Sequence, residues 1–500
     1  MIKRYIDLVS GNAKSNPESI AVIADGVRLT FSELDMRIGR LGSALRNAGL
    51  KTGARVALLA ANELEYVEIQ AACLRSGFTM VPLNIRLALP ELAFIIDDSE
   101  PAIIIGGRNQ HERVKELALS NSVQKVIGLG ETDDIESYGD FISRATPDPD
   151  ADPLDPDIVC TILYTSGTTG RPKGAVIDRL GLTARVFVNS FELESSSNDI
   201  FVAFLPMFHI SAYLVYASLF SGGTVVMPPE FTPESCVEIL EREKATSMVL
   251  VPTMIRMLID SPAVENFDPS NLRLIVYGGE SIPPAVLKRA VDKFQCGFHQ
   301  QYGMTETGGQ SVLRCADHIT DDYEILGSAG KDAVTFEVRV VDDNDKDVQE
   351  GEPGEVVCRG PAVMTEYWRR PDATEETLKN GWMHTGDIGL RDKNGYLHII
   401  DRRNDMILSG GENIYPREVE QILMGHPQVS EATVIGLPDP KWGEVVTCIL
   451  VGETPEEKEL EEYLRKHIAG YKLPRKWFRL DELPRNAAGK VLKNILREQL

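Results

Sequence analysis

Hydrophobic and polar positions recur with two different spacings along the chain, and these spacings predict helices and strands in turn. Across residues 32–47 apolar side chains recur every three or four positions, as on one face of a helix, and Gly49 then marks its end. These side chains are Leu34, Ile38, Leu41 and Leu45. A mostly apolar run at 55–60 follows and predicts a buried strand.

The same order of helix and apolar strand returns further along the chain. Runs rich in β-branched residues at 248–251 and 272–277 predict strands, and an amphipathic pattern at 285–294 predicts a helix. Short apolar strands between helices are typical of parallel sheets that helices cover. We therefore predict an α/β fold with largely parallel sheets.

Two polar stretches predict boundaries. A proline- and aspartate-rich segment at 147–157 suits neither helix nor strand and predicts a surface connector. The charged stretch at 401–405 separates a strand at 396–400 from a tail of about 100 residues, an ordinary size for a small domain. In this tail we expect helices and strands in an α+β arrangement. They lie at 416–424, 432–436, 445–451 and 455–468.

Composition narrows the classes of function. Apolar residues make up 43% of the chain and charged residues 25%, as in soluble globular proteins. A net charge of −23 opposes binding to nucleic-acid phosphates, so we expect no nucleic acid partner. The seven cysteines are scattered and form no CxxC pair, which predicts a reducing, cytoplasmic location and no structural zinc. No run approaches about 18 apolar residues, so we expect no signal peptide and no membrane span.

The first candidate for chemistry is a loop of small residues, hydroxyls and two cations at 165–174. Its glycines allow close backbone approach, and its hydroxyl and N–H groups suit phosphate oxygens. No Gly-Lys-Ser/Thr sequence closes the loop, so an ordinary P-loop kinase or ATPase is disfavoured. A glycine- and threonine-rich surface turn is the alternative interpretation of this stretch alone.

Residues 164–174 resemble the signature loop of the adenylate-forming superfamily, which contains acyl-CoA synthetases, peptide-synthetase adenylation domains and luciferases. Further motifs match this family in the same order along nearly the whole chain. They are Tyr-Gly-Gly-Glu at 277–280, Gln-Tyr-Gly-Met-Thr-Glu-Thr at 301–307, His-Thr-Gly-Asp at 384–387, Asp-Arg at 401–402, Ser-Gly-Gly-Glu-Asn-Ile-Tyr-Pro at 409–416 and Pro-Arg-Asn-Ala-Ala-Gly-Lys at 484–490. The resemblance implies a large N-terminal adenylation domain of α/β sub-lobes at 1–400, a hinge at 401–404 and a small mobile α+β C-terminal domain at 405–500.

By this resemblance, ATP and AMP contact a phosphate loop, an adenine slot and a ribose acceptor. An aromatic face and a flat glycine backbone suit a purine, and Asp387 accepts hydrogen bonds from the ribose hydroxyls as an ionised carboxylate does. The implied residues are Thr165, Ser166, Gly167, Thr168, Thr169, Gly170, Lys173, Gly279, Glu280, Gln301, Tyr302, Asp387 and Arg402. Taken singly, Tyr302 also fits a core position, Asp387 a turn and Arg402 a surface ion pair.

The resemblance also assigns the catalytic groups. Lys490, on a loop flanked by glycine, reaches the acid carboxylate and the α-phosphate and stabilises the charge that develops during adenylation. Thr305 bonds the α-phosphate, and Glu306 holds Mg²⁺, which prefers carboxylate and phosphate oxygens. His209 resembles the aromatic residue that shifts between the two half-reactions. A solvated lysine, a helix start at Thr305 and a core histidine are the alternatives.

The acid pocket is expected around the sequence Pro-Met-Phe-His-Ile-Ser-Ala-Tyr at 206–213. Tyr213 occupies the position of an aromatic gate in long-chain fatty acyl relatives, although this position varies among aryl ligases. The implied pocket residues are His209, Tyr213, Gly303, Gly308 and Gly309. We expect a fatty acid first and an aryl or cinnamate-type acid second.

In this family the small domain rotates before the second half-reaction, and the expected hinge residue is Asn404. Relatives usually have Asp or Lys there, but asparagine tolerates unusual backbone angles, so we expect rotation to be retained. The motif at 409–416 is more similar to CoA ligases than to peptide-synthetase domains. The implied CoA residues are Arg86, Gly410 and Gly411. Arg86 also fits an ordinary surface cation.

The sequence therefore predicts an AMP-forming acid–thiol ligase that uses ATP, Mg²⁺ and coenzyme A. The carboxylate attacks the α-phosphate to give acyl-AMP and pyrophosphate, and the CoA thiolate then displaces AMP. An acyl-AMP ligase that loads a carrier protein is the enzymatic alternative, and a luciferase-like oxygenase has less support. A non-catalytic nucleotide or acyl sensor is disfavoured because Lys490, Glu306 and Asp387 are present. A homodimer is left open.

Overall fold

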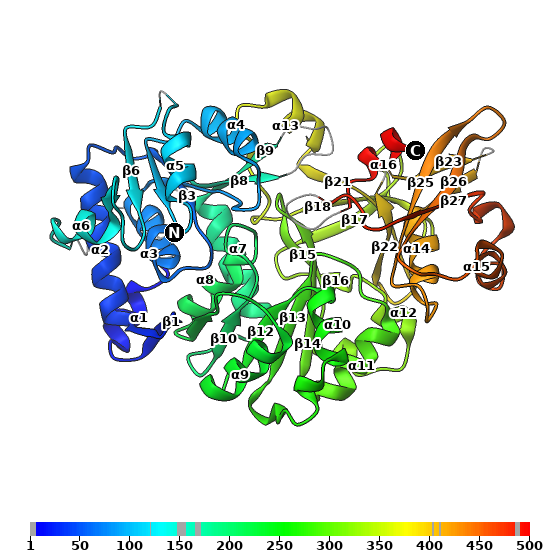
Figure 1. Cartoon of the computed structure of the whole chain (residues 1–500), viewed down its shortest axis with the longest axis horizontal. Coiled ribbons are helices and arrows are strands. Elements are labelled where there is room, and N and C mark those ends of the chain that lie inside the picture. Colours follow the sequence, from blue (N-terminus) through cyan, green and yellow to red (C-terminus); the bar gives the residue numbers. More distant parts are fainter. Residues whose placement is uncertain are drawn as a thin grey trace. The chain divides into compact units, whose positions relative to one another are not determined.

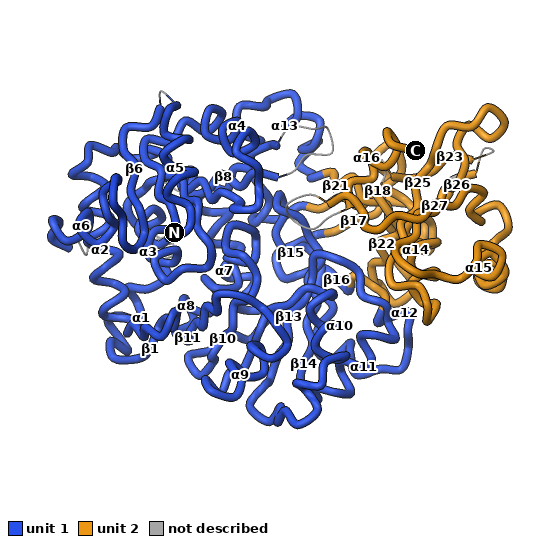
Figure 2. Tube along the Cα trace, in the orientation of Figure 1, with its two compact units in different colours: residues 1–326, 330–337, 359–383 blue, residues 327–329, 338–358, 384–500 orange. Residues whose placement is uncertain are grey.

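The computed structural model describes residues 7–120, 122–147, 157–165, 172–402, 405–409, 412–485 and 491–500. The chain forms two compact units (Figure 2). The first comprises residues 1–326, 330–337 and 359–383, and the second comprises 327–329, 338–358 and 384–500. None of the helices in the described ranges is both long and apolar enough to cross a membrane.

The first unit contains an eight-stranded sheet of order β19-β9-β8-β4-β3-β5-β6-β7 (Figure 1). Its strands are β3 (Arg55–Leu59), β4 (Thr79–Pro82), β5 (Ile103–Gly106), β6 (Lys125–Gly128), β7 (Glu136–Ser137), β8 (Val159–Thr165), β9 (Lys173–Asp178) and β19 (Glu366–Tyr367). The strands from β8 to β7 pair in parallel, whereas β9 pairs antiparallel with both β8 and β19. Helices α4 (Leu89–Ser99) and α5 (His111–Leu117) bury apolar side chains against this sheet.

A nine-stranded sheet of order β16-β15-β14-β13-β12-β10-β11-β1-β2 also belongs to the first unit. Its strands are β1 (Ile20–Ala24), β2 (Val27–Thr30), β10 (Ile200–Ala203), β11 (Thr224–Met227), β12 (Ser247–Leu250), β13 (Leu274–Gly278), β14 (Gly297–Met304), β15 (Gly308–Leu313) and β16 (Lys331–Asp332). Strands β1 and β10–β14 are parallel, and β14 and β15 form an antiparallel hairpin. Helices α9 (Pro233–Glu243), α10 (Pro252–Asp260) and α11 (Pro284–Phe294) share one buried apolar cluster with this sheet.

Two five-stranded sheets complete the fold. One has the order β17-β18-β21-β20 with β22 beside β21, and the other has β24-β23-β26-β25 with β27 beside β26. The strands are β17 (Glu337–Val341), β18 (Gly354–Arg359), β20 (Leu378–Lys379), β21 (Trp382–Arg391), β22 (Leu397–Arg402), β23 (Ile407–Ser409), β24 (Glu412–Ile414), β25 (Glu431–Asp439), β26 (Gly443–Val451) and β27 (Lys476–Leu480). Helices α14 (Pro416–Met424) and α15 (Glu457–Leu464) bury a separate apolar cluster against the sheet that contains β25 and β26.

The remaining helices lie between these strands along the chain. They are α1 (Ser10–Ser15), α2 (Phe31–Asn47), α3 (Leu64–Ser76), α6 (Tyr138–Ser143), α7 (Arg179–Glu192), α8 (Ala212–Phe220), α12 (Tyr323–Leu326), α13 (Pro371–Thr377) and α16 (Lys493–Gln499). Of these, α7 and α8 pack on each other within the first unit. Helix α7 matters for the site below because it also contacts β15.

The predicted α/β fold with a smaller α+β part is confirmed. The helix expected at 32–47 is α2, which begins after Thr30 because the Thr30 hydroxyl accepts a hydrogen bond from the Glu33 N–H in a capping box. The expected strands at 248–251 and 272–277 are β12 and β13, and the helix at 285–294 is α11. Periodicity therefore located these elements to within two or three residues.

One helix of the tail is shorter than the sequence predicts. The helix expected at 455–468 extends only over α15, from Glu457 to Leu464. Its buried side chains are Leu460 and Leu464, and the residues at 465–467 are exposed, so burial does not support the helix over these three residues. The domain boundaries at 400 and 405 stay a prediction. Most of the expected connector, at 148–156, lies outside the described residues.

Candidate active site

The loop predicted to bind triphosphate connects the two strands of an antiparallel hairpin. Thr165, the last residue of β8, pairs with Lys173, the first of β9, and Thr165 Oγ1 donates a hydrogen bond to the Lys173 carbonyl oxygen at 3.4 Å. The other predicted loop residues lie outside the described ranges. They are Ser166, Gly167, Thr168, Thr169 and Gly170. The structure thus places both ends of the loop on neighbouring strands.

Tyr367 on β19 joins two of the predicted ligand-binding residues. Its hydroxyl donates a hydrogen bond to Glu306 Oε1 at 2.7 Å, and the Lys173 ammonium lies 5.2 Å from the centre of its ring. β19 brings the ring here because it pairs antiparallel with β9, with Tyr367 opposite Ala175. A carboxylate and a cation are therefore arranged around one buried aromatic side chain.

Glu306 is the candidate Mg²⁺ ligand, and its side chain is buried. Within the described part of the chain, no three His, Cys, Asp or Glu side chains gather as a metal site. A single carboxylate nevertheless suits Mg²⁺, because this ion often takes one or two carboxylates and completes its shell with phosphate oxygens and water. The donor set therefore fits a magnesium ion that arrives with a triphosphate.

The turn between β14 and β15 presents Thr305 and Glu306. It is closed by a hydrogen bond from the Met304 N–H to Thr307 Oγ1 at 3.1 Å. Tyr302, the predicted adenine contact, is a half-buried residue of β14 just before this turn. Because β14 continues the run of parallel strands, the turn stands at their carboxyl ends, where open α/β sheets commonly bind ligands.

Three predicted pocket glycines shape the same hairpin. A Cβ atom at Gly303 would lie 1.5 Å from the Gly308 carbonyl oxygen, so a side chain there would displace the backbone. Gly308 adopts φ +75°, a conformation that favours glycine. A Cβ atom at Gly309 would approach Gln301 Oε1 to 3.4 Å. The hairpin therefore requires glycine at 303 and favours it at 308, whereas a Cβ atom at 309 would make an ordinary contact.

The predicted adenine residues come together at the ends of two neighbouring strands. Gly278 on β13 pairs with Gln301 on β14, and Gly279 and Glu280 follow β13 directly with exposed side-chain positions. Gln301 Nε2 donates a hydrogen bond to Asn189 Oδ1 on α7 at 2.8 Å. This contact orients the Gln301 amide and connects the strand end to helix α7.

Asp387 and Arg402, the predicted ribose contacts, meet in the second unit. They face each other across β21 and β22, and Arg402 Nε lies 2.6 Å from Asp387 Oδ1. Thr385 fixes the preceding turn, since its hydroxyl donates to the Val356 carbonyl oxygen at 2.7 Å and accepts from the Asp387 N–H at 3.1 Å. The buried Asp387 carboxylate is thus held in an ion pair with Arg402.

His209 and Arg86, predicted for different substrates, lie close enough to interact. Burial lowers the pKa of His209 to about 4, and the positive charge of Arg86 adds to this effect. The imidazole is therefore neutral at pH 7. Asn62 supports the segment that precedes His209. Its Oδ1 accepts a hydrogen bond from the Met207 N–H at 2.8 Å, and its Nδ2 donates to the Leu205 carbonyl oxygen at 2.9 Å.

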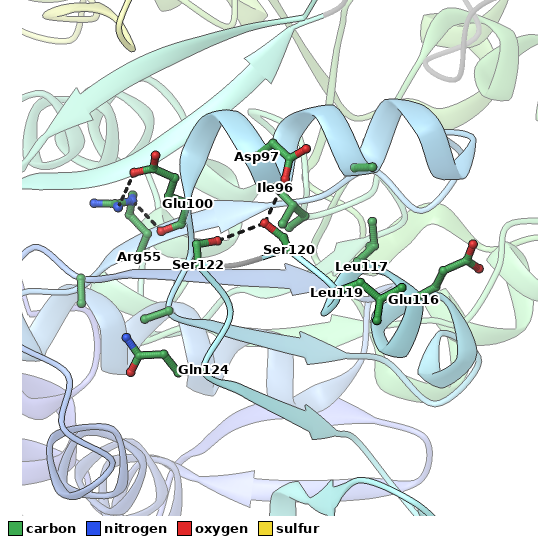
Figure 3. Close-up of a pocket in the computed structure, with 13 residues that line it drawn as sticks. Arg55, Ile96, Asp97, Glu100, Glu116, Leu117, Leu119, Ser120, Ser122 and Gln124 are labelled. Carbon is green, nitrogen blue, oxygen red and sulfur yellow. Dashed lines mark hydrogen bonds and ion pairs between the residues drawn. The ribbon is translucent and has the colours of Figure 1, made fainter.

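A separate cavity of about 820 Å³ lies at the amino ends of β3, β5 and β6 (Figure 3). Arg55 and Glu100 line it, as do Ser120 and Asp97, and Ser120 Oγ donates a hydrogen bond to Asp97 Oδ1 at 2.9 Å. None of the residues predicted from the sequence lines this cavity. It opens at the strand ends opposite to those where parallel sheets usually bind ligands.

Several predicted residues fall outside the described ranges. They are the catalytic Lys490, the hinge residue Asn404, and the CoA residues Gly410 and Gly411. Their roles stay predictions.

Sequence reasoning missed four side chains that support the site: Asn62, Arg185, Asn189 and Tyr367. Asn62 follows strand β3 closely, and a polar residue after a buried parallel strand is a usable signal. Arg185 and Asn189 are four residues apart and share a face with buried Leu182, so helical periodicity would have marked both as polar groups on a buried face. Tyr367 offers no local signal.

The chain matches the AMP-binding enzyme family over residues 9–368 and the AMP-binding enzyme C-terminal domain over 418–490. It is 38% identical over 492 residues to a feruloyl-CoA synthase of an Amycolatopsis species, with 97% of each chain covered. It is 35% identical over 508 residues to a fatty acid–[acyl-carrier-protein] ligase of Streptomyces coeruleorubidus, covering 100% of this chain and 96% of that protein. The solved structure of o-succinylbenzoate CoA synthetase from Bacillus subtilis, in complex with its acyl-adenylate intermediate, matches with a TM-score of 0.88, 32% identity and 98% coverage of both chains.

Proposed function

Since this chain belongs to the family of AMP-binding enzymes, we propose that it activates a carboxylic acid with ATP and passes the acyl group to the thiol of coenzyme A. Its reaction type is that of an AMP-forming acid–thiol ligase. The observation that supports this most strongly is the arrangement around Tyr367. Its hydroxyl bonds the Glu306 carboxylate, and its ring contacts Lys173, which lies at one end of the glycine-rich loop.

Each group then has a role in adenylation. Lys173 attracts triphosphate oxygens, and Glu306 would hold Mg²⁺, which would neutralise phosphate charge. Thr305 donates a hydrogen bond to the α-phosphate as the carboxylate attacks. Lys490 stabilises the charge that the attack creates. Positioning and electrostatics supply this step, since no covalent bond to the protein is required.

Two sets of residues recognise the nucleotide. Gly279, Glu280, Gln301 and Tyr302 form the adenine slot, and Asp387 takes the ribose hydroxyls in place of part of its ion pair with Arg402. Rotation about Asn404 then removes Lys490 and brings Gly410 and Gly411 to the CoA thiol, with Arg86 at the CoA phosphates. These assignments rest on the family resemblance.

The acid belongs to one of two candidate classes, a fatty acid or an aryl or cinnamate-type acid. Similarity to the feruloyl-CoA synthase favours the second class, and similarity to the fatty acid–[acyl-carrier-protein] ligase supports the first. The same ligase makes a carrier-protein thiol the alternative acceptor. All seven cysteines are free thiols, which fits a reducing compartment such as the cytoplasm. A homodimer stays a prediction.

The test is release of AMP and pyrophosphate from MgATP with a panel of straight-chain and aromatic acids. Each acid is run alone, with CoA and with a phosphopantetheinylated carrier protein, and products are identified by mass. An acyl-CoA that forms only with CoA supports the proposal. Acyl-AMP that accumulates with CoA but is consumed by the carrier supports the alternative acceptor, and absence of turnover with every acid contradicts an enzyme of either kind.

A further inference from the structure

Asp98, near the carboxyl end of helix α4, accepts hydrogen bonds from two segments that lie 66 and 272 positions away in the sequence. The Tyr164 hydroxyl donates to Oδ2 at 2.7 Å, and Arg370 Nη2 donates to Oδ1 at 2.6 Å. The Asp98 carbonyl oxygen also accepts a hydrogen bond from Trp368 Nε1 at 3.0 Å. The side chain of Asp98 is only 10% exposed. A largely buried carboxylate therefore joins two separate segments of the first unit.

The first of these segments leads into the phosphate loop. Tyr164 directly precedes Thr165, the residue at the start of the loop, and pairs with Gly174 across β8 and β9. A Cβ atom at Gly174 would lie 3.1 Å from Cζ of the Tyr164 ring, so the ring lies against this glycine. Burial raises the pKa of Tyr164, and its hydroxyl therefore stays protonated and can donate at neutral pH. Asp98 thus holds the residue from which the loop begins.

The second segment follows Tyr367, the residue that bonds Glu306 and contacts Lys173. Three positions after Tyr367, Arg370 forms its ion pair with Asp98. Strand β19, which contains Tyr367, has only two residues, and a ladder this short provides few hydrogen bonds of its own. The ion pair therefore adds a further attachment for the segment that directs the Glu306 carboxylate.

We propose that Asp98 is a positioning residue for the triphosphate of MgATP. Through Tyr164 it holds one end of the phosphate loop, and through Arg370 it holds the segment whose tyrosine directs the candidate Mg²⁺ ligand. The inference rests on the proposed function. A carboxylate suits this task because it offers one acceptor oxygen to each donor, and its charge strengthens the bond to a guanidinium. Helix α4 is a firm base, since its apolar side chains are buried in the core of the sheet.

The test compares the binding of two nucleotides to each variant by calorimetry. MgATP carries the β- and γ-phosphates that the loop, Lys173 and Mg²⁺ are proposed to bind, whereas AMP lacks both. In Asp98→Asn, one of the two donors meets an NH2 group in place of an acceptor oxygen. We expect the Kd for MgATP to rise by about 10-fold, the effect of one lost hydrogen bond to a charged group, and the Kd for AMP to stay the same.

Tyr164→Phe removes one of the same hydrogen bonds from the other side. It should also weaken MgATP selectively, and it decides the test by the same comparison if Asp98→Asn does not fold. Because both substitutions break one bond, the double variant should lose less affinity for MgATP than the product of the two single losses.

Asp97→Asn is the matched control. Asp97 is the neighbouring carboxylate of α4, and it accepts a hydrogen bond from Ser120 Oγ on the surface of the protein. This variant should bind both nucleotides as wild type does. A loss of MgATP affinity in Asp97→Asn equal to that in Asp98→Asn would assign the effect to the charge of the helix end and overturn the inference.

Turnover gives a second measure on the same preparations. In Asp98→Asn, pyrophosphate release at low MgATP should fall by about 10-fold. Conversion of supplied acyl-AMP and CoA to acyl-CoA should keep the wild-type rate, because this step needs no triphosphate. A selective loss of MgATP binding supports the inference even if wild type adenylates no acid, in which case the proposed function fails alone. Unchanged MgATP binding, or an equal loss of affinity for MgATP and AMP, overturns it and leaves Asp98 as a support of the fold.

Discussion

Tyr367 donates a hydrogen bond to the Glu306 carboxylate at 2.7 Å, although 61 positions separate the two residues in the sequence. The contact depends on a two-residue strand, β19, which pairs with β9 beside the phosphate loop. It fixes the direction of the carboxylate proposed to hold Mg²⁺. The same ring lies under the Lys173 ammonium, so one side chain contacts both groups that we propose for binding MgATP.

Replacing Tyr367 with phenylalanine should therefore weaken the binding of the Mg²⁺ that adenylation requires. A hydrogen bond to a charged group contributes about 1.5–3 kcal/mol, so we expect at least a 10-fold lower kcat/KM for MgATP and a higher Mg²⁺ concentration for half-maximal pyrophosphate release. Tyr323→Phe, at an exposed tyrosine, is the control and should match wild type. An unchanged Mg²⁺ titration in Tyr367→Phe would show that Glu306 needs no such support.

Replacing Gly303 with alanine should disrupt the β14–β15 hairpin. The new Cβ atom would lie 1.5 Å from the Gly308 carbonyl oxygen, so the backbone has to move and Thr305 and Glu306 move with it. We expect adenylation to fall by about 100-fold or more, since small displacements of reacting groups have effects of this order. Gly139→Ala in α6, where no atom lies within 4 Å, should retain activity and a similar Tm. Activity retained by Gly303→Ala would refute the close approach.

Replacing Asp387 with asparagine should raise the KM for ATP more than it changes the KM for the acid. The carboxylate offers two acceptor oxygens to the two ribose hydroxyls. An amide offers one acceptor oxygen and an NH2 group, which cannot accept a hydrogen bond from the second hydroxyl. The loss of the ion pair with Arg402 also frees that side chain. Steady-state kinetics with ATP and acid varied in turn measure both constants. A change confined to the acid would contradict the ribose assignment.

Folding stability should fall as the pH drops below 6.5. Burial lowers the pKa of His299 to about 3 and of His318 to about 4 from an ordinary value of 6.5. Between these values the unfolded chain binds protons that the folded chain does not, so each histidine removes up to about 1.4 kcal/mol of stability per pH unit. Urea unfolding from pH 7 to pH 4.5 measures the slope.

The control separates these two residues from general acid effects. Burial lowers the pKa of His318 and keeps the ring neutral, although the Arg314 carbonyl oxygen, 2.8 Å from Nδ1, opposes this effect. The Tyr277 hydroxyl lies 3.0 Å from Nε2. His318→Gln should reduce the slope, whereas His467→Gln, at an exposed position, should leave it unchanged. Equal slopes in all three proteins would assign the pH dependence to other groups.

Much of the fold followed from local spacing. Helices α2 and α11 and strands β12 and β13 were located because a buried face repeats every 3.6 residues in a helix, and short apolar runs between helices mark buried strands. The end of α15 was placed too late because the pattern gives no measure of where burial stops. Element ends depend on neighbours that local spacing does not describe.

The supporting side chains of the site were harder to predict because they act across large separations in sequence. Arg185 reaches Glu306 over 121 positions, and Asn62 reaches Met207 over 145. A motif specifies residues that contact a ligand, since their spacing within one loop is fixed by that ligand. The groups behind them are defined only when strands and helices have been assembled, so the fold is needed to find them.

The most direct test of the central claim is acid-dependent exchange of labelled pyrophosphate into ATP in the absence of CoA. The account predicts exchange with wild type, because adenylation is complete and reversible before any thiol binds, and a loss of about 100-fold or more in Lys490→Ala, which lacks the cation that stabilises the reacting phosphate. Lys490→Ala should still convert supplied acyl-AMP and CoA to acyl-CoA. Exchange that requires CoA, or turnover that yields ADP and phosphate, would contradict an adenylate-forming ligase.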